Sequence, residues 1–176
     1  VEPDLTYTVA AARLPTISDL QTSTAGLPAN FDRETYLSIP APPPAVVSLL
    51  QQAQTLPSQW DKFDFLRNQI LDNVGATGTG SPVSITPERI QDMLAGSKEG
   101  SPFEIVAAQA MLARWAGVPS RIGYGFDGGE LVEDVLQVRP KHGATFVEVY
   151  FPTYKWLPVI GVPKKAKPTV GSDPGT

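Results

Sequence analysis

Apolar residues recur three or four positions apart in three stretches of the first half of the chain, the spacing of an amphipathic helix. The stretches contain Val46, Leu49, Leu50 and Ala53, then Phe63, Leu66, Ile70 and Val74, then Ile90, Met93 and Leu94. Ser58 and Thr86 stand just before the second and third stretches, where a helix N-cap is expected. The pattern therefore predicts three helices before residue 97.

A fourth predicted helix, from Ser101 to Gly117, carries the strongest local signals. Ser101 suits the N-cap, Pro102 suits the first helical position, and Glu104 completes a capping box. Gly117 suits the C-cap, and the Val118-Pro119 pair stops the helix. Many of its residues are alanines, namely Ala107, Ala108, Ala110, Ala113 and Ala116. So many small side chains predict a central helix packed closely against other elements.

Strand-like runs dominate the second half of the chain. They cover residues 121–126, 134–139, 145–151 and 154–159, with a turn at Asp127-Gly128-Gly129. In the third run, alternation places Ala144, Phe146, Glu148 and Tyr150 on one face and Thr145, Val147, Val149 and Phe151 on the other. We expect an α+β fold in which an antiparallel sheet packs on the central helix.

The two ends of the chain carry weaker patterns. Residues 1–34 are expected to be extended or looped, with a short strand near Thr6–Ala10 and a loop over Thr16–Asn30. Residues 163–176 are rich in lysine, proline and glycine, which predicts a disordered linker. The domain itself is expected to span residues 35–162. Within it, the glycine-rich stretch Gly75–Ser84 is expected to be a flexible loop.

Composition narrows the chemistry. The 176 residues contain no cysteine and one histidine, which excludes cysteine catalysis, disulfides and thiolate metal sites. No calcium-binding loop motif occurs, so neither a metal nor a cofactor is expected. A net charge of −4 argues against nucleic-acid binding. The sequence lacks any run of about 18 apolar residues, so we expect a soluble fragment, and its start at Val1 suggests excision from a larger protein.

The central helix, the turn AGVPSRIGYGF and the later VEVYFPTYKWLPV together resemble the transglutaminase-like branch of the papain-like cysteine proteins. The resemblance covers roughly residues 35–160. The upstream YLSIPAPPP and DKFDFLRNQI further resemble extracytoplasmic domains of multi-pass bacterial membrane proteins in this family. The resemblance thus implies a papain/transglutaminase-like core, on the extracytoplasmic face of a bacterial membrane, in a parent protein embedded in that membrane.

Members of that family use a Cys-His-Asp triad, and the motif carries its three positions onto Pro102, Ala144 and Ile160. None of these residues can replace the catalytic side chain. The scaffold positions of the motif are retained, namely Gly100, Gly117, Pro119, Arg121, Glu148 and Trp156. The resemblance therefore implies a pseudoenzyme with no catalytic residue at the family positions.

Family members accept a peptide or a glutamine or lysine side chain in a cleft between the helix and the sheet. The candidate cleft residues in this sequence are Phe103, Tyr124, Phe146, Glu148 and Trp156. We expect them to bind a peptide, a protein or a cell-envelope component. Ordinary core packing is the alternative role for each.

Two further functions stay open. Ser101 and His142 could form a relocated serine hydrolase or acyltransferase site, with Asp127, Glu133 or Asp134 as the orienting acid. Against it, Ser101 is expected to cap the helix, and a shift of two residues along a strand moves a side chain by about 6 to 7 Å. The chain could also be a structural spacer within a membrane protein.

Overall fold

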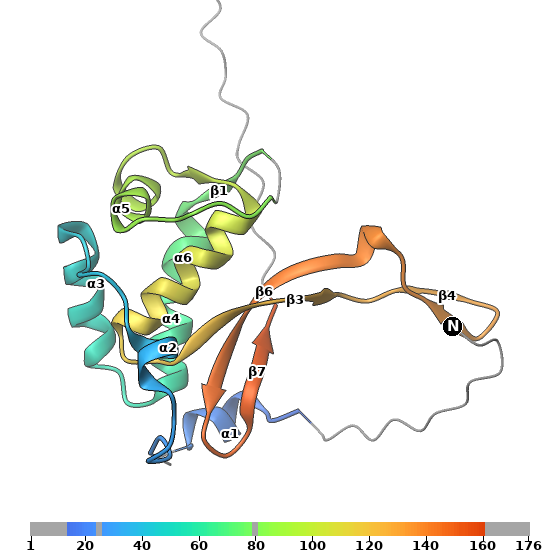
Figure 1. The fold of residues 1–176 in the computed structure, drawn as a ribbon, viewed down its shortest axis with the longest axis horizontal. Helices are drawn as coiled ribbons and strands as arrows, with labels where there is room; N and C mark the ends of the chain where they lie inside the picture. Colours follow the sequence, from blue (N-terminus) through green and yellow to red (C-terminus); the bar gives the residue numbers. More distant parts are fainter. Residues whose placement is uncertain (1–13, 24–25, 79–80, 161–176) are drawn as a thin grey trace, which may run out of the picture.

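A computed structural model describes residues 14–23, 26–78 and 81–160. Its helices are α1 (Ile17–Gln21), α2 (Arg33–Leu37), α3 (Pro44–Gln54), α4 (Gln59–Asn73), α5 (Pro87–Ala95) and α6 (Pro102–Trp115), with a 3₁₀ turn η1 (Pro140–His142). Its strands are β1 (Gly75–Ala76), β2 (Glu99–Gly100), β3 (Ser120–Phe126), β4 (Glu130–Val132), β5 (Val135–Gln137), β6 (Gly143–Phe151) and β7 (Lys155–Val159). Helices gather on one side, and the sheet extends away from them (Figure 1).

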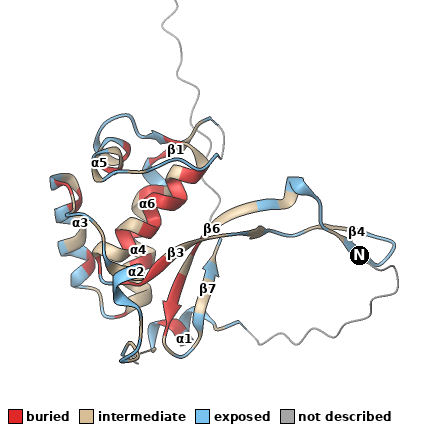
Figure 2. Ribbon diagram, viewed as in Figure 1, coloured by how far each residue is buried: buried red, intermediate tan, exposed pale blue. Residues whose placement is uncertain are grey.

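Helix α6 lies at the centre of the helical layer and is buried along most of its length (Figure 2). Its start is the predicted capping box: the Glu104 amide donates to Ser101 Oγ at 3.2 Å, and the Ser101 amide donates to Glu104 Oε2 at 2.8 Å. Its end is a Schellman motif, with Gly117 N–H donating to Arg114 and Val118 N–H to Ala113. Both ends of the predicted central helix are confirmed.

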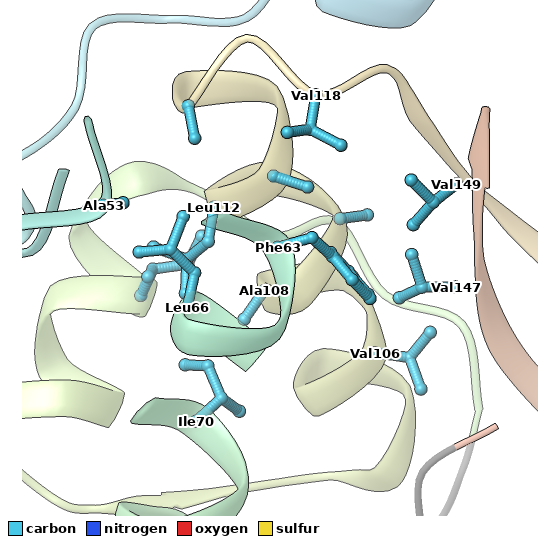
Figure 3. Close-up of a cluster of buried hydrophobic side chains, with 14 of the residues drawn as sticks. Ala53, Phe63, Leu66, Ile70, Val106, Ala108, Leu112, Val118, Val147 and Val149 are labelled. Carbon is cyan, nitrogen blue, oxygen red and sulfur yellow. The ribbon is translucent and has the colours of Figure 1, made fainter. Parts of the chain in front are cut away.

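The core fills the space between α4, α6 and the sheet (Figure 3). Phe63, Leu66 and Ile70 of α4 are fully buried and follow the predicted apolar stripe. They face the small residues of α6, such as Ala108, which allow close approach of the two helices. The alanines of α6 thus serve helix packing, as the sequence predicts.

The main sheet has the order β3-β6-β7, and both pairings are antiparallel. Val147, Val149 and Phe151 of β6 are buried in the core. By alternation, Phe146 and Glu148 lie on the opposite, outer face. The predicted α+β architecture and the two faces of this strand are confirmed.

The N-terminal part contains two short helices that the sequence pattern did not predict. The loop expected over Thr16–Asn30 contains α1, which Thr16 and Asp19 cap reciprocally, and α2 begins at Arg33 inside the segment expected to be extended or looped. A five-residue helix such as α1 buries only Leu20, so it shows no apolar period. The predicted strand at Thr6–Ala10 and linker at 163–176 lie outside the described residues.

The second predicted strand does not join the main sheet. It corresponds to β5, which pairs with β4 in a separate hairpin that projects away from the helices (Figure 1). Glu133 and Asp134 adopt φ of 48° and 64° at the hairpin tip, as a two-residue type I′ turn requires. The usual Asn-Gly signal is missing there, which hid the hairpin from the sequence pattern. Likewise, the loop expected at Gly75–Ser84 begins with β1, which pairs with β2.

Replacing Gly117 with alanine should destabilise the fold by about 1 to 2 kcal/mol, because Gly117 has φ of +79° and a side chain disfavours that conformation. No atom lies within 4 Å of the added Cβ, so the effect isolates backbone strain. Gly26→Ala is the matched control, because Gly26 also has open space but no positive φ. Urea unfolding should separate the two variants. Equal stability would show that the helix does not end in this conformation.

Candidate functional site at the start of helix α6

A closed polar network surrounds the N-terminus of α6. The Arg89 guanidinium of α5 donates to Glu104 through Nε at 2.7 Å and through Nη2 at 3.1 Å, a two-pronged ion pair. Arg89 also contacts Asp92 at 2.6 Å and donates to the Glu99 carbonyl at 3.1 Å. The Glu104 carboxylate therefore serves the helix cap and the neighbouring helix together.

This network sets the charge of Glu104. The hydrogen bond from Arg89 is the main cause that lowers the Glu104 pKa from its ordinary 4.5 to about 2, while partial burial opposes the shift. The same pair raises the pKa of Arg89. The carboxylate is ionised at neutral pH and lies in the first turn of the helix, where the macrodipole favours a negative charge.

A cavity of about 450 Å³ lies beside this helix start. Four of its seven lining residues carry a hydroxyl group; the lining consists of Ser81, Val83, Ser84, Thr86, Arg89, Ser101 and Glu104. The charged pair in the wall is already mutually satisfied. The cavity can therefore offer hydrogen bonds to a polar ligand, but it provides no evident nucleophile activated by a base.

The three positions carried over from the family motif have no catalytic chemistry. Pro102 is the first residue of α6 and has neither a nucleophile nor an N–H group. Ala144 lies in β6, opposite Gly125. Ile160 follows β7, is 43% exposed, and accepts a long 3.4 Å hydrogen bond from Arg67 through its backbone carbonyl.

Ser101 and His142 each have another partner. The Ser101 hydroxyl accepts the Glu104 amide, and His142 Nδ1 accepts the Arg139 amide at 2.9 Å. His142 lies in η1, which Pro140 begins, so it does not continue the face of β6 that holds Ala144. The backbone N–H of Asp127 donates a 2.9 Å hydrogen bond to the His142 carbonyl. This arrangement does not favour a relocated serine site.

The other two candidate orienting acids, Glu133 and Asp134, lie at the tip of the β4-β5 hairpin. Their position there is fixed by the turn of the hairpin. The structure gives neither carboxylate a contact with His142.

The five predicted cleft residues do not share one surface. Phe103 is only 7% exposed, whereas Tyr124 is 62% exposed and pairs across the sheet with Thr145, on the side that faces the core. Phe146 and Glu148 lie on the outer face. Phe146 covers Gly123 so closely that a Cβ there would lie 2.5 Å from its ring.

Trp156 belongs to an aromatic cluster on this outer face. It contacts Tyr36 and Tyr150, with ring centroids 4.7 and 5.2 Å apart, and Arg121 stacks over its ring at 4.3 Å. Arg121 also pairs with Glu148 at 2.5 Å. The retained Arg121, Glu148 and Trp156 thus form one structural unit. Sequence reasoning missed Tyr36 because it is distant in the chain, and it missed the Arg89–Glu104 pair for the same reason.

The Arg89–Glu104 pair should make stability depend on acid pH. A carboxyl group whose pKa falls on folding stabilises the fold above its unfolded pKa of 4.5, and this stabilisation is lost as the pH falls toward about 2. The wild type should therefore lose more stability over this window than Arg89→Met, in urea unfolding at several pH values. Arg33→Met is the control, because Arg33 has no salt bridge among the described residues. Identical pH profiles for the wild type and Arg89→Met would contradict the pairing.

Comparisons with known proteins agree with this architecture. The chain is similar to the crystal structure of the periplasmic domain of TgpA from Pseudomonas aeruginosa, with a TM-score of 0.55 and 24% identity over 70% of this chain and 44% of that one. The structure of the same domain bound to ethylmercury gives a TM-score of 0.53 and 24% identity, over 70% of this chain and 45% of that one. The chain thus spans less than half the length of the TgpA domain.

No curated protein sequence matches the chain. Among the described residues, no helix is long and apolar enough to cross a membrane. The model of the transglutaminase-like superfamily matches residues 48–159, which is most of the chain and includes α6 and the whole main sheet. The chain belongs to the transglutaminase-like superfamily.

Proposed function

We propose that this chain is a catalytically inactive transglutaminase-like domain that binds a peptide, a protein or a cell-envelope component. One observation carries the proposal: no cysteine occurs in the sequence, and the residue onto which the family motif carries its nucleophile position is Pro102, at the first turn of α6. A thiolate in the family depends on the N–H groups and dipole at a helix start. Here Ser101 and Glu104 use that start for the helix cap.

Binding is supported by surface that the fold leaves uncovered. Tyr124 and Phe126 are 62% and 61% exposed. They lie on the face of β3 that, closer to the helices, is turned toward the core. Exposed aromatic side chains on one strand are typical of contact sites. The cavity beside Ser101 adds the hydrogen-bonding groups of four hydroxyl-bearing residues at the start of α6.

The extracytoplasmic location of this domain is also part of the proposal. It is supported by the similarity to the periplasmic domain of TgpA, which the chain covers only in part. In this proposal the domain belongs to a larger membrane protein of a bacterium and presents its binding surface outside the cytoplasm.

The purified chain should incorporate no amine into glutamine peptides and should hydrolyse no peptide, because no nucleophile stands at Pro102. A catalytically active superfamily member assayed in parallel is the positive control. A fluorophosphonate probe tests the serine alternative directly. Turnover or labelling that is lost in Ser101→Ala and kept in Ser84→Ala would contradict the proposal and establish a serine enzyme.

Binding should depend on the uncovered aromatic surface. Isotope-labelled protein titrated with bacterial envelope fragments and soluble envelope peptides should show shifted amide signals near Tyr124. Tyr124→Ala should weaken the binding at least about tenfold, as loss of an aromatic contact worth roughly 1.4 kcal/mol would do. The control is Leu131→Ala, which removes a similarly exposed apolar side chain from the β4-β5 hairpin. Unchanged affinity in Tyr124→Ala and Phe126→Ala would count against this surface.

A further inference from the structure

Strand β3 has an unpaired edge. In the order β3-β6-β7 it is an outer strand, so among the described residues only one of its sides pairs with another strand. The Tyr150 amide donates to the Pro119 carbonyl, and the Asp127 amide donates to the His142 carbonyl. These two bonds show which residues of β3 direct their backbone groups toward β6. Antiparallel ladders alternate, so odd-numbered residues of β3 bond to β6. The backbone N–H and C=O groups of Ile122 and Tyr124 therefore point toward the free edge.

A partly apolar cavity of about 280 Å³ lies beside this edge, and Ile122 is part of its lining. Helix α6 contributes Ala107, Ala110 and Met111, and the segment Ile39–Pro40 and Ile85 contribute further apolar surface. The small alanines leave room between the helix and the strand. The volume suits a single aliphatic side chain together with part of a peptide backbone.

Arg114 stands at one end of the same cavity. It donates to the carbonyl of Ser120 from Nε at 3.0 Å and from Nη2 at 2.8 Å, so it lies on the edge side of β3. Arg89 and Arg121 each pair with a glutamate, whereas Arg114 has no salt bridge within the described part of the chain. Partial burial lowers its pKa, yet an arginine stays charged. A half-buried guanidinium without a carboxylate partner can be stabilised by an anionic ligand.

We propose that the free edge of β3 and this cavity bind the C-terminal end of an extended peptide whose last side chain is small and aliphatic. A peptide that continues the antiparallel sheet runs opposite to β3, so its C-terminus arrives at Ser120, beside Arg114. The peptide backbone pairs with Ile122 and Tyr124. Its carboxylate accepts from the remaining N–H groups of Arg114, and its last side chain rests on Ala107 and Ala110.

Strand addition of this kind obtains affinity from the backbone and specificity from a side-chain pocket and a carboxylate-binding group. All three parts occur together here within one segment of β3 and one face of α6. The site is separate from the cavity beside Ser101. The inference rests on the proposed binding function and names one ligand for it. Loss of the preference for the acid alone would reject this ligand and leave the proposed function standing.

The test uses the complete chain and acetylated tetrapeptides that end in alanine, valine or leucine. Each peptide is prepared as the free acid and as the amide. We expect the acids to bind at least about tenfold more tightly than the amides, since a charge-assisted hydrogen bond is about twice as strong as a neutral one. Amide signals of Ile122 and Tyr124 should shift on binding. Equal affinity of acid and amide, or shifts confined to residues around Ser101, would overturn the proposal.

Variants separate the parts of the site. Arg114→Met should abolish the preference for the acid, and Arg114→Lys should retain part of it. Because Arg114 also holds Ser120, Ala110→Leu is a second and independent variant: it fills the cavity and should weaken the leucine peptide more than the alanine peptide. Arg139→Met, on the exposed β5–η1 connection, is the matched charge control. Binding of decanoate with no binding of any peptide acid would assign the cavity to a lipid and reject the peptide proposal.

Discussion

The start of helix α6 is the constraint on which the rest of the structure depends. A buried helix must satisfy its first N–H groups, and this chain does so with its own side chains. Pro102 removes one donor, Ser101 accepts another, and Glu104 returns its carboxylate to the Ser101 amide. Arg89 holds that carboxylate and ties α5 to α6. The field that would stabilise a thiolate in other superfamily members here stabilises a glutamate.

The same helix organises the layers around it. Its alanines let α4 approach on one side, while Val147 and Val149 of β6 pack on another (Figure 3). The family resemblance therefore survives in the parts that packing requires. Arg121 contacts both Glu148 and Trp156, which joins the sheet to the aromatic cluster on the outer face.

Sequence reasoning predicted the elements with strong local signals. Helix α3 begins at Pro44 and has an apolar stripe, and helices α4 to α6 have side-chain N-caps. Strand β6 has dense β-branched and aromatic residues. Helix α1 escaped because five residues bury a single leucine, and the β4-β5 hairpin escaped because Glu133 and Asp134 adopt positive φ without a glycine. Both depend on contacts or strain that no short pattern records.

For the site, the motif places the family's triad positions on Pro102, Ala144 and Ile160, and this assignment stays a prediction. The sequence did not show that the cleft residues lie on different surfaces. Tyr124 and Phe146 lie on opposite faces of the sheet, because the register of the β3-β6 pairing determines which residues share a face. Arg114 and Ser120 are in contact because the chain reverses direction between α6 and β3, and the sequence does not reveal this contact.

The most direct test is a high-resolution crystal structure that locates the Ser101 hydroxyl. We expect Ser101 Oγ to remain near 3.2 Å from the Glu104 amide nitrogen, and His142 Nδ1 to accept the Arg139 amide. A Ser101 Oγ turned to within about 4 Å of an imidazole nitrogen would contradict this expectation, because that geometry is what a serine nucleophile and its base require.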